Sequence, residues 1–124
     1  MTDLRTIEIK AYVPARDFTL SQQFYRDFGF KVEPMSDQMA FCHCDGSSFL
    51  LQNYYVKEYA ENFMMHILVQ DVESWWDHIV RKDIGTTYGV MIEPISNKPW
   101  GLRDFAVADP AGVLWRIGQE IVVE

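Results

Sequence analysis

The sequence predicts an α+β fold built from a βαβββ unit that occurs twice. Two observations support this prediction. An alternating apolar strand, an amphipathic helix and three short strands follow one another before residue 54 and again after residue 62. Each copy also ends in a hairpin, with turns at Asp45-Gly46 and at Asp109 to Gly112. We therefore expect one domain, 1–124, made of module 1 (about 5–53), a connector (54–62) and module 2 (about 63–120).

The first module opens with a strand and a helix. Residues 7–13 alternate between apolar and polar side chains, which is typical of a half-buried strand. Asp17 is a favourable N-cap for the helix that follows, and Gly29 is a favourable end. The apolar face of the first strand is expected to lie under the helices and consists of Ile7, Ile9 and Val13.

Three short strands complete this module, at 30–34, 39–44 and 47–53. The last two are joined at Asp45-Gly46, which is a strong signal for a tight hairpin turn. The polar segment that follows, 54–62, has no hydrophobic period and is predicted to be a connector.

The second module repeats the order. A strand at 63–69 leads to a helix that Asp71 caps and Gly85 ends. The expected buried face of this helix consists of Val72, Trp75 or Trp76, Ile79 and Val80. The remaining elements are a strand at 86–92, a loop at 93–100, and strands at 102–108 and 113–118 that are joined by a turn at 109–112.

Composition and charge narrow the range of functions. The formal net charge of −7 argues against nucleic acid and anionic membrane as partners, because both would repel the chain. We find no apolar leader and no run long enough to span a membrane. Cys42 and Cys44 lie two apart on one expected strand, too far for a relaxed disulfide. We therefore expect reduced thiols and a cytoplasmic protein.

Three segments carry a resemblance to a known family. They are Ala-Arg-Asp-Phe…Gln-Phe-Tyr-Arg-Asp-Phe-Gly-Phe at 15–30, His-Ile-Leu-Val-Gln-Asp-Val at 66–72, and Arg-Asp-Phe-Ala-Val-Ala-Asp-Pro-Ala-Gly at 103–112. With them the chain resembles the vicinal oxygen chelate superfamily, which includes glyoxalase I, extradiol dioxygenases and bleomycin-resistance proteins. The resemblance implies curved mixed sheets around a cavity, the glyoxalase/bleomycin-resistance fold. It also implies a homodimer whose subunits complete each other's pockets.

The same resemblance bears on metal binding. Enzymes of the family hold a divalent cation at four strand positions, and the matching residues here are Lys10, Leu50, His66 and Arg116. Only His66 can bind a metal, and each basic residue would repel a cation 4–5 Å away by about 3–4 kcal/mol. The sequence therefore predicts no metal and no other cofactor. A displaced metal site remains open as an alternative, with Glu8 and Gln52 beside His66.

Among members without metal ligands, the chain resembles the bleomycin-resistance type, which has a similar Pro-Trp-Gly loop before its Arg-Asp-Phe-Ala strand. The resemblance implies sequestration of a cationic or heteroaromatic antibiotic in a dimer groove. Strand alternation and the loop position of Trp100 predict these ligand-binding residues: Glu8, Lys10, Tyr12, Gln52, His66, Trp100 and Arg116.

Three other interpretations remain open. One is a metal-dependent glyoxalase-like or dioxygenase-like lyase or isomerase, with a displaced site around His66. Another is an interaction module without a small ligand. In the third, Glu8 pairs with Lys10 or Arg116 in a polar cluster that binds nothing. No spacing in the sequence indicates a covalent nucleophile, and no catalytic residue is predicted.

Overall fold

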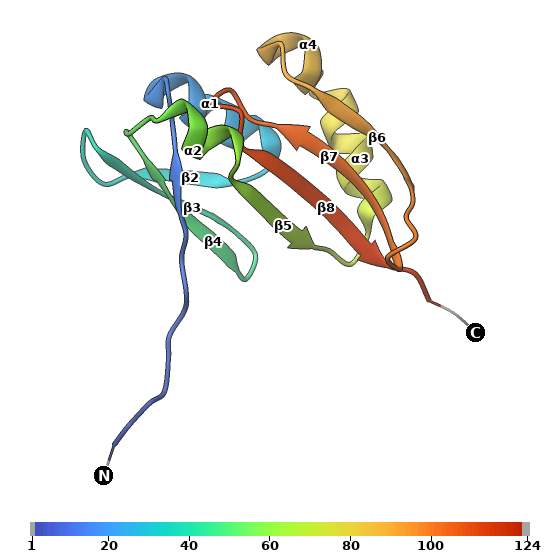
Figure 1. Ribbon diagram of the computed structural model, residues 1–124, viewed down its shortest axis with the longest axis horizontal. Coiled ribbons are helices and arrows are strands. Elements are labelled where there is room, and N and C mark those ends of the chain that lie inside the picture. The colour runs from blue at the N-terminus through green and yellow to red at the C-terminus, as the bar shows by residue number, and fades with distance from the viewer. Residues whose placement is uncertain (1, 123–124) are drawn as a thin grey trace.

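The protein contains two four-stranded sheets, in a computed structural model that describes residues 2–122 (Figure 1). The outermost positions of the predicted domain, 1 and 123–124, lie outside the described residues. In chain order the elements are β1 (Tyr12–Pro14), α1 (Phe18–Phe28), β2 (Lys31–Pro34), β3 (Met39–Cys44), β4 (Ser47–Gln52), α2 (Lys57–Glu61), β5 (Met64–Leu68), α3 (Val72–Arg81), α4 (Ile84–Tyr88), β6 (Ile92–Asn97), β7 (Leu102–Ala108) and β8 (Leu114–Glu120). The predicted α+β class is confirmed.

The two sheets have the same topology. The first has the order β1-β4-β3-β2 and the second the order β5-β8-β7-β6. In each sheet the first strand pairs in parallel with the last strand of its module, and the remaining pairs are antiparallel. The predicted mixed sheets are confirmed, and each module places its first strand at one edge of its sheet.

A single aromatic core joins the two modules. Tyr25 of α1, Phe49 of β4 and Trp115 of β8 are buried together, with ring centroids 4.9 to 5.6 Å apart. The first two rings belong to module 1 and the third to module 2, so the modules share one interior.

A polar contact runs through this core. The Tyr25 hydroxyl donates to Asp109 Oδ2 at 2.5 Å and accepts from Trp115 Nε1 at 2.9 Å. Asp109 Oδ1 accepts from the backbone N–H groups of Ala111 and Val113, each at 2.9 Å. Burial raises the pKa of the Asp109 carboxyl to about 6. The β7–β8 turn is thereby bonded directly to the first helix.

The N-caps of α1 and α3 are the predicted residues, but α3 ends earlier than predicted. Asp17 Oδ1 accepts from the Leu20 N–H at 3.1 Å, and Asp71 Oδ1 accepts from the Ser74 N–H at 3.2 Å. Helix α3 ends at Arg81 rather than at the predicted Gly85. Val80, which we expected on its buried face, is 56% exposed.

The predicted first strand at 7–13 is wrong over most of its length. Strand pairing covers only Tyr12–Pro14, opposite Leu50 to Gln52 of β4. Because β4 begins at Ser47 and runs parallel, the residues before position 9 have no β4 backbone opposite them. Ile7 and Ile9, expected under the helices, are 100% and 92% exposed. Residues 2–9 instead form an extended, exposed arm whose outer part stands away from the body (Figure 1), whereas the Ala11 carbonyl accepts from the Leu50 N–H at 3.0 Å.

The predictions for 86–92 and 93–100 are also wrong. The first segment begins within the short helix α4, and the second contains the edge strand β6. Tertiary contacts override the β-propensity of α4, because Ile84 is buried and the Tyr88 hydroxyl donates to Asp27 at 2.5 Å. Pro94 is tolerated in β6 because this outer strand has an irregular register between Glu93 and Ser96.

The predicted connector at 54–62 contains one short helix, α2, whose Ala60 is buried.

Among the residues that the structure describes, no helix has the length and apolar character needed to cross a membrane.

Candidate functional site

Four of the seven predicted binding residues, Tyr12, Gln52, His66 and Arg116, lie on the open faces of the two sheets, opposite the faces that form the core. Tyr12 of β1 is the register partner of Leu50 of β4, and Gln52 lies two residues further along β4. On the second sheet, His66 of β5 is the register partner of Arg116 of β8. Strand alternation therefore assigned the faces of these four residues correctly, and they are divided between the two sheets.

The first group surrounds the base of the N-terminal arm. Glu8 and Lys10 form an ion pair, and the Ser48 hydroxyl donates to Glu8 Oε2 at 2.9 Å. The contact with Lys10, followed by that with Ser48, lowers the pKa of Glu8. The Lys10 ammonium lies 5.6 Å from the ring centroid of Phe41 on β3. The open interpretation that Glu8 pairs with Lys10 is therefore the arrangement in the structure.

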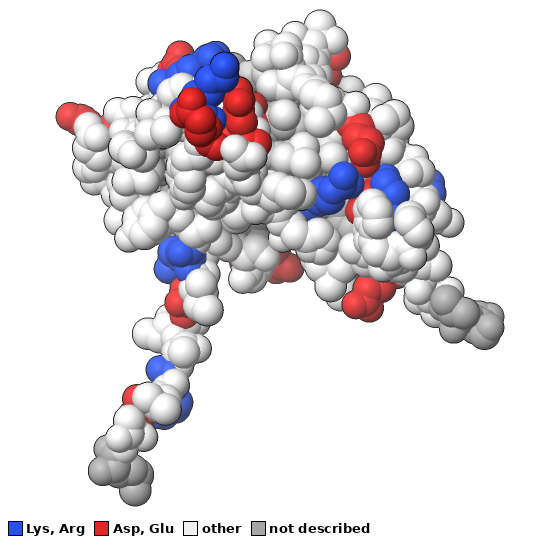
Figure 2. Space-filling view, in the orientation of Figure 1, with Lys and Arg blue, Asp and Glu red and all other residues white. Residues whose placement is uncertain are grey.

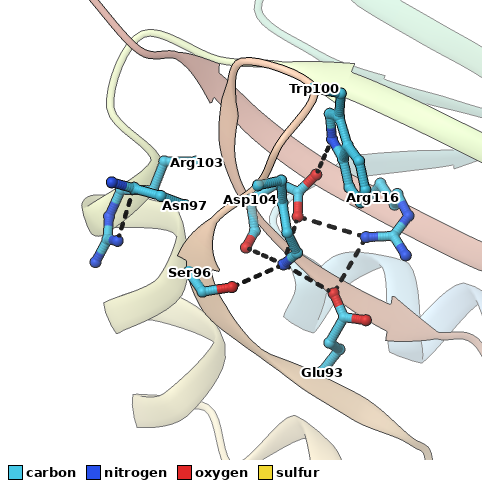
Figure 3. A network of polar contacts seen from close by, with 8 residues as sticks. Glu93, Ser96, Asn97, Trp100, Arg103, Asp104 and Arg116 are labelled. Atoms are coloured by element: carbon cyan, nitrogen blue, oxygen red, sulfur yellow. Dashed lines mark hydrogen bonds and ion pairs between the residues drawn. The ribbon is translucent and has the colours of Figure 1, made fainter.

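The second group is an ionic network on the other sheet, formed by Glu93, Lys98, Trp100, Asp104 and Arg116 (Figure 3). Its centre is the carboxylate of Asp104, which is fully buried. Asp104 Oδ1 lies 2.9 Å from Lys98 Nζ and 3.4 Å from Arg116 Nη1. Asp104 Oδ2 accepts from Trp100 Nε1 at 3.2 Å. One carboxylate thus holds two cations and an indole.

Glu93 closes the network from the edge strand β6. Its Oε2 lies 3.1 Å from both Lys98 Nζ and Arg116 Nη1. Hydrogen bonds from Lys98 and then Arg116 lower the pKa of Glu93. Burial by itself would lower the pKa of Lys98, but the contacts with Asp104 and Glu93 outweigh burial and raise it. Two carboxylates and two cations therefore balance each other at this site.

Trp100 lies against this network while remaining 56% exposed. The Arg116 guanidinium carbon is 5.6 Å from the centroid of its ring, which is a cation–π distance (Figure 3). The hairpin that carries the indole is tight: Lys98 N–H donates to the Leu102 carbonyl at 2.7 Å, and Gly101 has a φ of +86°.

Sequence reasoning missed Glu93, Lys98 and Asp104. Glu93 and Lys98 fell in a segment predicted to be a loop, and in a loop the spacing of residues does not indicate where a side chain points. Asp104 did carry a signal, because it and Arg103 are charged residues in a strand whose other five residues are apolar. Its register partner is Gly118, and a Cβ atom there would lie 3.2 Å from Asp104 Cβ and 3.5 Å from His66 Nε2.

The structure does not bring the seven predicted residues around one cavity. Glu8 and His66 line a shared hollow of about 410 Å³ between the arm, the β3–β4 turn and β5. Tyr12 and Gln52 lie on the first sheet, whereas Trp100 and Arg116 meet on the second. Within one chain the predicted residues therefore do not form a single site.

The residues present do not fit the divalent cation of the enzymes that the sequence resembles. Arg116 lies directly across from His66, and both nearby carboxylates, Glu93 and Asp104, are engaged by cationic side chains. In the alternative of a displaced metal site, Glu8 would be a ligand, but its carboxylate is already paired with Lys10. Within residues 2–122, no three His, Cys, Asp or Glu side chains are grouped as a metal ion would require.

Comparison with known proteins reveals one matching family. The sequence model described as the Glyoxalase/Bleomycin resistance protein/Dioxygenase superfamily matches residues 9–117. A search of curated proteins finds no match.

Several solved structures share the fold. A bleomycin-binding protein from Streptomyces verticillus, complexed with copper(II)-bleomycin, has a TM-score of 0.79 and 22% identity, over 96% of this chain and 100% of that one. TnmS3, an antibiotic-binding protein from Streptomyces sp. CB03234, has a TM-score of 0.75 and 18% identity, over 97% and 100%. A lactoylglutathione lyase from Agrobacterium tumefaciens has a TM-score of 0.66 and 17% identity, over 93% and 94%. At these identities the likeness establishes the fold alone.

Proposed function

Because this chain belongs to the glyoxalase/bleomycin resistance protein/dioxygenase superfamily, we propose that it is a metal-independent protein that binds a small organic molecule. Its type is that of the bleomycin-resistance proteins, and its ligand is a cationic or heteroaromatic antibiotic. The observation that carries the proposal is the ionic network around Asp104. It pairs Arg116, whose position matches a metal ligand in enzymes that the sequence resembles, with two carboxylates, beside an exposed indole.

Charge supports a ligand with cationic groups. The chain carries a formal net charge of −7, which attracts cations at long range. On the face drawn in Figure 2, basic and acidic side chains lie side by side, without the broad basic surface that nucleic acid requires.

Cys42 and Cys44 are free thiols, and burial raises the pKa of Cys42 to about 12. Reduced thiols are typical of the cytoplasm, where we place the protein.

Ligand binding is tested by titration with bleomycin and with copper(II)-bleomycin, the ligand of one structural relative. We expect saturable quenching of tryptophan fluorescence at one ligand per chain. Trp100→Ala should weaken binding by about tenfold, because base- or ring-stacking on an indole is worth about 1–3 kcal/mol. Trp100→Phe is the matched control, which keeps an aromatic face and should lose less. Equal affinity of all three proteins would remove Trp100 from the site.

Metal independence has its own test. The purified protein is incubated with Ni²⁺, Zn²⁺, Mn²⁺ or Fe²⁺, dialysed, and analysed for bound metal beside a His66→Ala variant. We expect no stoichiometric metal in either protein, because His66 is the register partner of Arg116 and, among the residues described, belongs to no group of three potential metal ligands. Tight metal binding that disappears in His66→Ala would favour the alternative function, a metal-dependent lyase, isomerase or dioxygenase.

A homodimer completes the proposal. Leu4, Ile7 and Ile9 are 83%, 100% and 92% exposed on the arm, and Met64 and Leu68 are 59% and 55% exposed on the open face of β5. So much exposed apolar surface is typical of an interface. The outer part of the arm stands clear of the body (Figure 2), so it can reach a second copy of the chain. A dimer would also bring predicted binding residues of two chains together.

Sedimentation equilibrium tests the dimer. We expect a mass of twice 14.5 kDa. An Ile7→Asp/Ile9→Asp variant should dissociate at least about 100-fold more readily, because burying each isoleucine contributes about 1.5–3 kcal/mol. Thr6→Asp is the control, since it adds a charge to the same arm between the apolar positions. A wild-type mass of 14.5 kDa at every concentration would overturn the dimer.

A further inference from the structure

A cavity lies between helices α1 and α3, on the core side of the first sheet. It has a volume of about 260 Å³, and its lining residues are Phe28, Gly29, Cys44, Ser74, Trp75 and His78. Cys44 follows the buried residues Ala40 and Cys42 at alternate positions of β3, so it faces away from the open face of that sheet. This inner cavity is therefore separate from the ionic network around Asp104.

The aromatic walls of the inner cavity are fixed before any ligand binds. The ring centroids of Phe28 and Trp75 are 6.1 Å apart. His78 Nε2 donates to the Asp27 carbonyl at 2.7 Å, which ties α3 to the end of α1. Gly29 has a φ of +130°, and a Cβ atom there would lie 3.5 Å from Cζ3 of Trp75. An aromatic ligand would therefore meet walls that do not have to be ordered first.

The inner cavity continues into an outer hollow of about 460 Å³ beside the β3–β4 turn. The two spaces share Cys44, Ser74 and Trp75. Asp45 and Asp71 are the acidic residues that line the outer hollow. Among the described residues, no Lys or Arg lines either space. The combined site is thus aromatic at its inner end and negatively charged at its outer end.

Hydrogen bonds and burial maintain this difference in charge. The hydrogen bond from the Ser74 hydroxyl, followed by that from the Ser74 backbone N–H, lowers the pKa of Asp71 and keeps its carboxylate ionised. Burial, followed by the charge of Asp45, raises the pKa of Cys44 and keeps its thiol neutral. A neutral ring suits the inner cavity, and a cation suits the outer hollow.

We propose that the inner cavity and the outer hollow form a second binding site, for an arylalkylamine in its ammonium form. The aromatic ring of the ligand packs against Phe28 and Trp75, and its ammonium group lies in the outer hollow near Asp45 and Asp71. An anionic group in the same place would be repelled by these carboxylates. This site goes beyond the proposed function, because neither Trp100 nor Arg116 contributes to it.

Three probes of nearly the same size separate charge from shape. They are 2-phenylethylamine, which is cationic at neutral pH, neutral 2-phenylethanol and anionic 3-phenylpropanoate. Binding to the full chain is followed by the NMR shift of the Trp75 indole N–H. We expect the amine to bind about threefold to tenfold more tightly than the alcohol, as for exposed ion pairs, and the carboxylate to cause no saturable shift. Equal affinity of the amine and the alcohol, saturable binding of the carboxylate, or no binding of the amine would overturn the proposal.

The charge contribution is isolated by the variant Asp45→Asn/Asp71→Asn. Asparagine can cap α3 and tolerates the φ of +53° at position 45, so this variant should fold normally. It should bind the amine and the alcohol with affinities within about twofold of each other. Asp37→Asn/Glu58→Gln is the matched control, because it removes the same net charge at exposed positions outside both spaces. An unchanged preference in the first variant, or a lost preference in the control, would contradict the role of Asp45 and Asp71.

The thiol of Cys44 reports where the amine binds. It is half-buried and lines both spaces, whereas Cys42 is fully buried. We expect 2-phenylethylamine to slow the alkylation of Cys44 by iodoacetamide in proportion to the fraction of protein bound. A Cys44→Ala variant assigns the reaction to this thiol, since little alkylation should remain in it. Alkylation at the same rate with and without the amine would place the amine elsewhere and overturn the proposed site.

Discussion

Replacing Tyr25 with Phe is expected to lower the free energy of unfolding by about 3 kcal/mol, although the change removes one oxygen atom. The lost hydroxyl leaves Asp109 Oδ2 and Trp115 Nε1 without their partner inside the shared core. Buried polar groups that lose their partners cost about 1–3 kcal/mol each. Urea denaturation followed by tryptophan fluorescence measures the difference.

Tyr54→Phe is the matched control for this prediction. Tyr54 is 52% exposed, so removing its hydroxyl leaves no buried group without a partner. We expect a change of less than about 0.5 kcal/mol, as for most surface substitutions. If the two variants were equally stable, the contact between the modules would contribute nothing to the fold.

The second large effect concerns pH. Burial raises the pKa of Asp109 to about 6 in the folded protein, against an ordinary value of 3.8. A folded-state pKa above the unfolded one means that the folded state binds the proton more readily between these two values. The stabilising contribution is therefore complete below about pH 4 and is lost as the pH rises through 6. At about 1.4 kcal/mol per pH unit, roughly 3 kcal/mol of stability disappears over this range.

Comparison with Asp109→Asn isolates this effect from other titrating groups, such as Glu93, whose pKa is lowered and whose contribution has the opposite sign. The free energy of unfolding is measured for both proteins from pH 4 to pH 7. We expect the wild-type protein to lose about 3 kcal/mol relative to the variant as the pH rises. A difference that stays constant across this range would contradict the assignment.

Most of the fold could be predicted because its signals are local. Asp17 and Asp71 each cap a helix through a backbone N–H three residues away, and the turn at Asp45-Gly46 lies between two alternating strands. The failures are places where distant contacts decide. Residues 84–88 form a helix because Ile84 is buried and Tyr88 packs against α1, which no property of that segment indicates.

The candidate site could be predicted only in part, for a similar reason. Alternation put His66 and Arg116 on one face, since two-residue periodicity depends on the strand alone. It could not supply the partners of Arg116, because Glu93 and Asp104 come from two other strands. These contacts give a physical reason to expect no metal beside Arg116. Both nearby carboxylates, Glu93 and Asp104, are already paired with cationic side chains.

The extended arm has a consequence for how the molecule assembles. Residues 2–9 are exposed, and the shared aromatic core is complete without them. The body of each chain can therefore fold in a first-order step whose rate does not depend on protein concentration. Association through the arms would follow as a second-order step, which slows on dilution. In the proposed dimer, folding and assembly would thus be separable in time.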